Sequence, residues 1–381
     1  MLFCKSFLLA LTVLSLLHPS LSSENLDCRE PEDPLNGSTG ADLFADGQHM
    51  QGPSFPSVND ALEAVMLSNL VYSMRQSSDT HSCPEKLPSE FPPHLHCVFY
   101  NHRNSDGTEV AIFTSEEKKY IAVAYAGSDD PKDWWQDVDF KQVRFGPKDH
   151  PITEDKSVLV HSGFNEQVFD LGLFDSLRAV VSKFHFDHPT YRILFTGHSL
   201  GAGNSILASV AFAAQEPLLQ IETINFGAPR TGSEGFRGYA NAFPNLKIWR
   251  LVHNYDIVPR VPPPLHDKWK HPGHTVQLSP EHADAYYLHY GDKKLNYVGV
   301  PEDWDRKFPI TGARQHNLKK YMDYIQQKSV GDPSKYWVNH FVTTKESKRL
   351  QVIIDKEFRE AQREESIASK EAVKNMNAPE L

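Results

Sequence analysis

The chain of 381 residues has few cysteines and no excess of basic charge. Its four cysteines include no Cys-x-x-Cys pair, so that zinc or redox motif is absent and we expect no metal. The formal net charge of −10 does not indicate a nucleic-acid partner, because such proteins usually present a basic surface. After the first residues no apolar run is long enough for a transmembrane helix, and no internal repeat is visible.

The first residues resemble a targeting segment. Lys5 precedes an apolar run over residues 7–17, and small residues follow it. This pattern predicts a secretory signal peptide over residues 1–23, and therefore a secreted or secretory-lumen protein; the alternative is an uncleaved anchor. Residues 24–56 are rich in Pro, Gly, Asp and Asn, which predicts an extended arm carrying a possible glycan acceptor at Asn36.

The cysteines bear on the same compartment. Cys4 would leave with the signal peptide, so three cysteines remain. In an oxidising compartment we expect the close pair Cys83 and Cys97 to form a disulfide. Cys28 would then be free or bonded to another chain, because the count alone does not determine connectivity.

The middle of the chain alternates between two hydrophobic periods. Ser57 and Asp60 predict a capping box that starts a helix with an apolar face at Val58, Leu62, Met66 and Leu70. Asp106-Gly107 predicts a hairpin turn, and residues 120–127 form an apolar run typical of a strand covered on both faces. Further strands are predicted at 191–197, 221–229 and 246–258, with helices over 165–184 and 200–215. This alternation predicts an α/β domain with a largely parallel sheet, over residues 57–330.

The last part of the chain differs in character. Residues 331–381 are charged and helix-prone, with a short apolar stripe at Leu350, Ile354, Phe358 and Ala361. We expect a C-terminal helical extension docked by one face. The alternative is a helix that binds a partner.

Residues Gly197-His198-Ser199-Leu200-Gly201 fit the pattern G-x-S-x-G between a predicted strand and a predicted helix. A nucleophile on such an elbow has a strained backbone, and small neighbours allow the close approach of the chain. The N–H groups at the start of the following helix can stabilise an oxyanion. Ser199 is therefore a candidate nucleophile.

A nucleophilic serine requires a histidine base oriented by a carboxylate. Asp256 follows the strand predicted at 246–258 and is the candidate acid. Several histidines follow it in the sequence: His266, His271, His274, His282, His289 and His316. Spacing alone does not choose among them.

The segments "FTGHSLGAG", "HNYDIVPRVPP" and "VHSGF" together resemble the class 3 (fungal-type) lipase family over about residues 57–325. The resemblance implies an α/β-hydrolase fold with a central, mostly parallel sheet, flanking helices and a lid segment over the active site. It implies Ser199 as nucleophile, Asp256 as triad acid and His316, in "RQHNLKKYM", as base. Gln315 departs from the usual acidic neighbour and Tyr321 lies further on than in the family, so His271 and His274 remain alternatives.

The resemblance extends to the oxyanion hole and the lid. Ser128 in "AYAGSDD" and the backbone N–H of Leu200 correspond to the oxyanion donors, whereas Ala126 stands where the family often has arginine. The following segment resembles the lid, with Trp134 and Trp135 as candidate lipid contacts. Its many aspartates favour neutral or zwitterionic lipids, because anionic surfaces attract basic segments.

These observations predict a secreted serine hydrolase of carboxylic esters that needs no cofactor. A triacylglycerol lipase in transient contact with a lipid surface is the first expectation. A phospholipase A1 or a small-ester (feruloyl-type) esterase is the alternative within enzymes. A non-catalytic lipid-binding protein is the alternative outside them.

Overall fold

The computed structural model describes ten stretches of the chain, all within the compact unit Phe55–Leu381. These are residues 56–75, 78–85, 87, 91–128, 141–253, 256–262, 268–278, 286–289, 314–330 and 339–341. Several predictions lie outside them: the signal peptide 1–23, the arm up to residue 55, Cys28, Asn36, Trp134, Trp135 and the stripe from Leu350 to Ala361.

A mixed sheet of nine strands forms the centre of the described residues, in the order β1-β2-β3-β6-β7-β8-β9-β10-β11. The five strands from β3 to β9 are parallel neighbours, while β1 and β2 add antiparallel strands at one edge. The strands are β1 His96–Arg103, β2 Thr108–Ser115, β3 Tyr120–Tyr125, β6 Arg192–His198, β7 Ile221–Phe226, β8 Leu246–His253, β9 His274–Leu278, β10 Tyr286–His289 and β11 Asn339–Phe341. The predicted α/β class with a central, mostly parallel sheet is confirmed.

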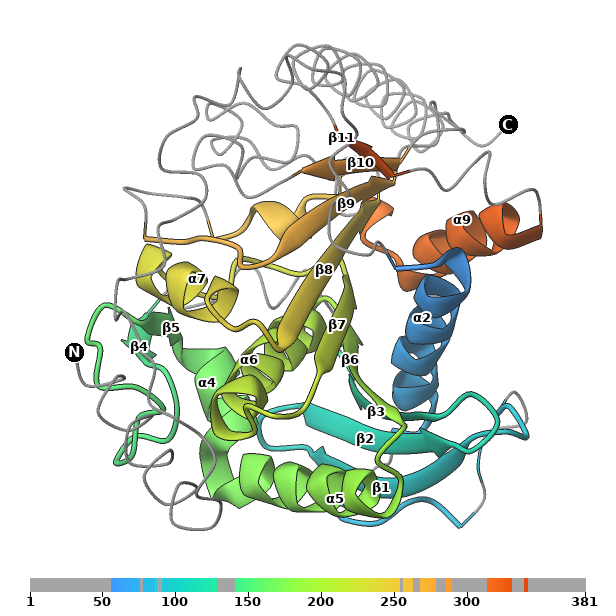
Figure 1. The fold of residues 1–381 in the computed structure, drawn as a ribbon, viewed down its shortest axis with the longest axis horizontal. Helices are drawn as coiled ribbons and strands as arrows, with labels where there is room; N and C mark the ends of the chain where they lie inside the picture. Colours follow the sequence, from blue (N-terminus) through green and yellow to red (C-terminus); the bar gives the residue numbers. More distant parts are fainter. Residues whose placement is uncertain are drawn as a thin grey trace, which may run out of the picture. The chain divides into compact units, whose positions relative to one another are not determined.

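Helices cover both faces of this sheet (Figure 1). Helices α2 and α9 lie on one face, and α4 to α7 lie on the other. The helices are α2 Val58–Ser73, α4 Ser162–Phe169, α5 Leu173–Asp187, α6 Leu200–Gln215, α7 Glu234–Asn241 and α9 Leu318–Val330. None of the described helices is long and apolar enough to cross a membrane.

Strand β3 explains why the run at 120–125 is apolar throughout. Its side chains alternate between two cores: Ala122 and Ala124 pack with α2, whereas Ile121 and Val123 pack with α6. All six residues of the strand are buried. A strand with a hydrophobic layer on each side has no solvent face, so it shows no polar alternation.

Helix α2 begins with the predicted capping box. The Asp60 amide donates to Ser57 Oγ at 3.0 Å, and the Ser57 amide donates to Asp60 Oδ2 at 3.3 Å. The predicted apolar face is only partly correct, because Leu62 and Met66 are half-buried while Ala61 and Val65 are fully buried. The reason is that α2 packs against both the sheet and α9, so more than one of its faces is covered.

The helix predicted over 165–184 is broken in the structure. Helix α4 ends at Phe169, a 3-10 turn spans Asp170–Gly172, and α5 starts at Leu173. Leu171 and Gly172 have left-handed backbone conformations, with φ of 57° and 71°, which no continuous helix accommodates. Helix α4 begins directly after the short strand β5 Leu159–His161. Strand β5 pairs with β4 Gln142–Arg144 in a separate two-stranded sheet.

The sheet continues into the predicted C-terminal extension. Asn339–Phe341 form β11, which pairs in parallel with β10 at residues Tyr286–Leu288. The charged composition of residues 331–381 gives no indication of this edge strand.

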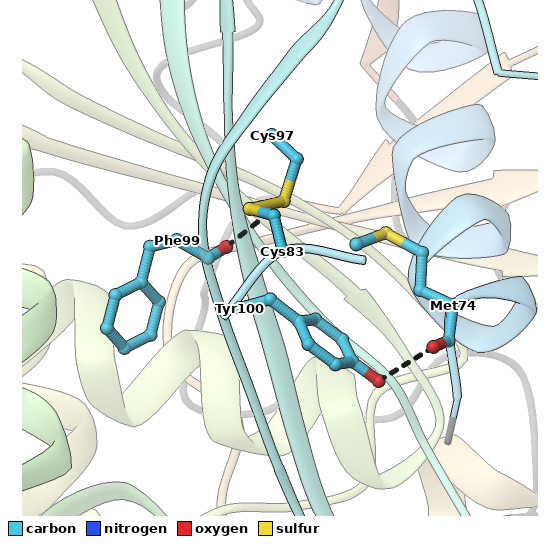
Figure 2. The surroundings of a disulfide bond; sticks show 5 residues. All are labelled: Met74, Cys83, Cys97, Phe99 and Tyr100. Carbon is cyan, nitrogen blue, oxygen red and sulfur yellow. Dashed lines mark hydrogen bonds between the residues drawn. A yellow bond between two sulfur atoms is a disulfide. The ribbon is translucent and has the colours of Figure 1, made fainter. Parts of the chain in front are cut away.

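Cys83 and Cys97, the predicted pair, are joined in a disulfide across a separation of 14 residues (Figure 2). The bond ties the segment after α2 to strand β1. Tyr100, three residues further along β1, directs its hydroxyl to the carbonyl of Met74 at 3.0 Å. The end of α2 is therefore fixed to the edge of the sheet at two neighbouring points.

Candidate active site

Ser199 lies at the sharp turn between β6 and α6. Its φ of 61° and ψ of −128° are strained for any residue other than glycine. A Cβ on Gly197 would lie 2.4 Å from the Gly201 carbonyl oxygen, and a Cβ on Gly201 would lie 2.4 Å from the Tyr125 carbonyl oxygen. Both glycines of the motif are therefore required by the close approach of the chain, and the strain concentrates at the serine between them.

Four loops of the candidate site follow the carboxyl ends of neighbouring parallel strands. Ser128 follows β3, Ser199 follows β6, Gly227 follows β7 and Asp256 follows β8. Open α/β sheets place their ligand sites at this edge. The arrangement of the strands in the sheet thus brings to one edge loops that are far apart in the sequence, such as those of Ser128 and Asp256, 128 positions apart.

Asp256 is fully buried and surrounded by three hydrogen-bond donors. Its Oδ2 lies 2.9 Å from Nδ1 of His316 and accepts from the Tyr321 hydroxyl at 2.5 Å, while Oδ1 accepts from the Val258 amide at 2.8 Å. Burial alone would raise the pKa of Asp256, but the charge of His316 and these hydrogen bonds outweigh it and lower the pKa. The side chain is therefore held as a carboxylate.

His316 precedes α9 and is 3% exposed. With Nδ1 bound to Asp256, its Nε2 is buried and has no hydrogen-bond partner among the described residues. The Ser199 amide donates to the Phe226 carbonyl at 3.1 Å, and a Cβ on the next residue, Gly227, would lie 2.9 Å from His316 Cε1. The end of β7 thus touches both the serine elbow and the imidazole.

His198 stacks on His316, with ring centroids 4.5 Å apart and an angle of 24° between the planes. Its Nε2 lies 2.8 Å from the carbonyl oxygen of His316, and its Nδ1 lies 3.1 Å from the Tyr72 hydroxyl. Burial, followed by the charge of His316, lowers the pKa of His198 to about 3. A neutral ring therefore supports the imidazole of His316.

The two alternative histidines have other surroundings. His271 Nε2 lies 2.6 Å from the Pro259 carbonyl oxygen, and His274 stacks on Trp249 with ring centroids 5.1 Å apart. Burial and the neighbouring Arg250 lower the pKa of both. The structure brings His316 to Asp256 and leaves these two apart from it. The described residues contain no group of three His, Cys, Asp or Glu side chains that could hold a metal ion.

The two candidate oxyanion donors lie on either side of the elbow. Leu200 is the first residue of α6 and is 5% exposed. Ser128 is half-buried and is the last residue of the described stretch 91–128. Gly127 packs on the elbow, since a Cβ there would lie 2.7 Å from the His198 carbonyl oxygen and 3.0 Å from Ser199 Cβ. The loop carrying Ser128 is therefore in contact with the serine.

Helix α2 contributes contacts that sequence reasoning missed. Ser68 lies 3.0 Å from Thr196 in β6, Tyr72 bonds to His198, and Arg75 Nη2 donates to the Gly127 carbonyl at 3.0 Å. The spacing of four and three residues puts these polar groups on one helix face. This spacing of polar residues is the sequence signal that could have indicated their contacts near Ser199.

A serine on a strand-to-helix elbow at the carboxyl edge of such a sheet defines the α/β-hydrolase class of fold. Within that class, residues 122–266 of the chain match the family model described as Lipase (class 3). The matched segment contains Ser128, Ser199 and Asp256 but neither α2 nor His316.

Named relatives are similar over part of the chain. A lipase of Rhizopus niveus is 30% identical over 158 residues, which are 40% of this chain and 37% of the relative. A secreted mono- and diacylglycerol lipase of Malassezia globosa is 28% identical over 188 residues, which are 48% of this chain and 60% of the relative. The matched segments thus span less than two thirds of the length of each of these relatives. The structure of the Rhizomucor miehei triacylglyceride lipase shares the fold, with a TM-score of 0.53 at 18% identity, covering 69% of this chain and 96% of that one.

Proposed function

We propose that the protein hydrolyses carboxylic esters of lipids, with Ser199 as nucleophile, His316 as base and Asp256 as the acid that orients the base. The observation that carries this proposal is the buried bond of 2.9 Å between His316 Nδ1 and Asp256 Oδ2, beside a strained serine elbow. Such an arrangement activates a hydroxyl that is a weak nucleophile at its own pKa.

The reaction follows from these positions. His316 Nε2 accepts the proton of Ser199 Oγ as this oxygen attacks the ester carbonyl carbon. Asp256 fixes the tautomer and stabilises the imidazolium. The tetrahedral oxyanion is stabilised by the Leu200 amide and by the amide and hydroxyl of Ser128. The intermediate collapses as His316 gives its proton to the leaving alcohol. A water molecule, deprotonated by His316, then attacks the acyl carbon; the bond to Ser199 Oγ breaks as His316 returns the proton to this oxygen, and the acid is released.

Triacylglycerol is the substrate we propose first. The names of similar proteins include triacylglyceride lipases and mono- and diacylglycerol lipases. The many aspartates after Ser128 favour a neutral or zwitterionic surface over an anionic one. Tighter binding to anionic vesicles than to zwitterionic ones would contradict this preference. Phospholipase A1 activity remains the second candidate, since phosphatidylcholine is zwitterionic.

We propose that the protein acts outside the cell or in the secretory lumen. The Cys83–Cys97 disulfide supports an oxidising compartment, because such bonds are rare where thiols are kept reduced. Secretion of tagged full-length protein, compared with protein lacking residues 1–23, tests this part of the proposal.

The central experiment measures hydrolysis of a triacylglycerol emulsion, a phosphatidylcholine dispersion and a soluble short-chain ester. Ser199→Ala tests the nucleophile, and Ser176→Ala, an exposed serine of α5, is the matched control. We expect emulsion hydrolysis that Ser199→Ala abolishes and Ser176→Ala retains. Activity on the soluble ester alone would favour an esterase, and no Ser199-dependent activity on any substrate would favour a non-catalytic lipid-binding protein.

A further inference from the structure

Arg75, just after helix α2, connects two parts of the molecule. Its Nε donates to Glu109 Oε2 at 2.7 Å, and its Nη2 donates to the carbonyl oxygen of Gly127 at 3.0 Å. Glu109 is completely buried in β2, whereas Gly127 belongs to the loop that carries Ser128. The guanidinium thus links a rigid strand to the loop beside the serine elbow.

The orientation of one peptide group depends on this contact. The carbonyl of Gly127 and the N–H of Ser128 belong to the same peptide unit, which is planar and trans, so they point in opposite directions. A donor that fixes the carbonyl on one side therefore fixes the N–H on the other. We propose that Arg75 is a positioning residue that aims the Ser128 amide at the oxyanion of the reaction. This inference rests on the proposed function, in which Ser128 is an oxyanion donor.

Glu109 contacts the loop at two points. Its side chain binds Arg75, and its carbonyl oxygen accepts from the Ala126 amide at 3.0 Å, in the peptide unit that precedes Ala126. Ala126 has no polar side chain of its own to anchor the loop, and the positive charge is supplied instead by Arg75, just after α2. Both anchors of the loop thus originate in the same buried residue of β2.

A second layer supports Glu109. The Tyr100 hydroxyl lies 2.6 Å from Glu109 Oε1 and 3.0 Å from the Met74 carbonyl oxygen, so it joins β1, β2 and the end of α2. Figure 2 shows the contact with Met74. The Arg75 guanidinium also lies over the ring of Tyr72, 5.8 Å from its centroid. The Arg75 side chain therefore has few accessible rotamers. Little further side-chain entropy is lost when it holds the Gly127 carbonyl in one orientation.

The contact also affects the strength of the donor. A charge-assisted hydrogen bond to a carbonyl polarises the peptide, and hydrogen bonds in a chain strengthen one another. The N–H of Ser128 then meets a charge that develops only in the transition state. Loss of Arg75 should consequently lower kcat and leave KM nearly unchanged.

The experiment compares Arg75→Met and Arg75→Lys with the wild type on a soluble short-chain ester. Arg103→Met is the matched control, since Arg103 is a buried arginine that binds Thr108 and the Gln167 carbonyl instead of the loop. We expect Arg75→Met to lower kcat by about 10- to 100-fold and to leave KM within about threefold of the wild-type value. Removal of a whole oxyanion donor costs about 100- to 1,000-fold in kcat, so the loss should not exceed the lower end of that range. The lysine should recover part of the loss, because it keeps the charge but loses the two-point geometry.

A trifluoromethyl ketone provides the second measurement, because its adduct with Ser199 carries an oxyanion. Its affinity should fall in Arg75→Met by the same factor as kcat. Equal kcat losses in Arg75→Met and Arg103→Met, or an unchanged ketone affinity in Arg75→Met, would overturn the inference. If Arg75→Met does not fold, Glu109→Gln and Arg75→Lys carry the same comparison. A wild-type protein without Ser199-dependent hydrolysis would overturn the proposed function itself.

Discussion

Tyr321 and His316 bind the same oxygen of Asp256: the phenol lies 2.5 Å and the imidazole Nδ1 lies 2.9 Å from Oδ2. Tyr321 is five residues after His316, in the first turn of α9. Helix α9 therefore supplies a second donor to the carboxylate from the same segment that carries the candidate base. The fully buried carboxylate keeps its charge without contact with water.

We expect Tyr321→Phe to weaken this site without removing it. Loss of a buried hydrogen bond to a charged group should lower the free energy of unfolding by about 1.5–3 kcal/mol. Tyr239→Phe, which removes a hydroxyl from α7 on the other face of the sheet, is the control. Because the folded-state pKa of Asp256 is lowered, its stabilisation is present above the unfolded pKa of about 3.9 and is lost as pH falls through the folded pKa. Urea unfolding at pH 7 and pH 3 should accordingly give a smaller difference between wild type and Tyr321→Phe at the lower pH.

Gly227→Ala should separate His316 from Asp256. Gly227 has a φ of 59°, and the new Cβ would lie 2.8 Å from Asp256 Oδ2 and 2.9 Å from His316 Cε1. Displacement of catalytic groups by about 1 Å can cost about 100-fold in rate, and we expect a loss of kcat of that order. Gly107→Ala has the same kind of backbone strain, at a φ of 66°, but no atom within 4 Å of the new Cβ. It should lose about 1–2 kcal/mol of stability and retain its kcat. Equal kcat values in the two variants would contradict the prediction.

Four histidines with lowered pKa values should make the protein sensitive to mild acid. Burial lowers the pKa of His198 to about 3 and of His253 and His274 to about 4, and it holds the pKa of His271 well below its usual range. At pH 5 these rings are neutral in the folded state and protonated in the unfolded state, whose pKa is about 6.5. Unfolding should therefore take up about four protons from these groups, and stability should fall as pH decreases from about 6.5.

Calorimetric unfolding at pH 5 in buffers of different ionisation enthalpy measures this proton uptake. His274→Phe should lower the uptake by about one proton at pH 5 and by none at pH 8, where the ring is neutral in both states. An unchanged uptake in His274→Phe at pH 5 would show that the ring is already protonated in the folded protein.

The disulfide should contribute stability more than activity. Closing a loop of about 15 residues lowers the entropy of the unfolded chain by an amount equivalent to about 3 kcal/mol. We expect the double substitution Cys83→Ser and Cys97→Ser to lower the midpoint of thermal unfolding while hydrolysis at low temperature persists, because Tyr100 remains paired in the sheet. A reducing agent should lower the midpoint of the wild type and leave that of the double variant unchanged. If the reducing agent lowered the midpoint of both proteins, its effect on the wild type would not come from the Cys83–Cys97 disulfide.

Local sequence patterns were sufficient for the elbow and its surroundings. The apolar run of β6, the two glycines and the small residues of α6 each act over a few positions, and helix α6 spans the predicted residues 200–215. Asp256 could also be predicted from the sequence, because it follows strand β8 at the expected place. His316 needed the family resemblance, since nothing in the local sequence relates it to an aspartate 60 residues earlier.

Local sequence patterns could not predict the contacts of α2 or the break between α4 and α5. The bond between Tyr72 and His198 joins residues 126 positions apart and depends on how a whole helix lies on the sheet. Leu171 is 89% exposed, so its apolar character, which favours a continuous helix in the sequence, reflects no packing. In both cases tertiary structure determines the outcome and local propensity does not.

Helix α2 covers the sheet over Ala122 and Ala124 and contacts His198, and Arg75, just after the helix, binds the Gly127 carbonyl. The residues matched by the family model begin only at position 122, after α2 and the first two strands. A polypeptide trimmed to that match would therefore expose a bare sheet face and an open strand edge, both prone to aggregation. The residues before this match therefore both cover one face of the sheet and supply contacts around Ser199.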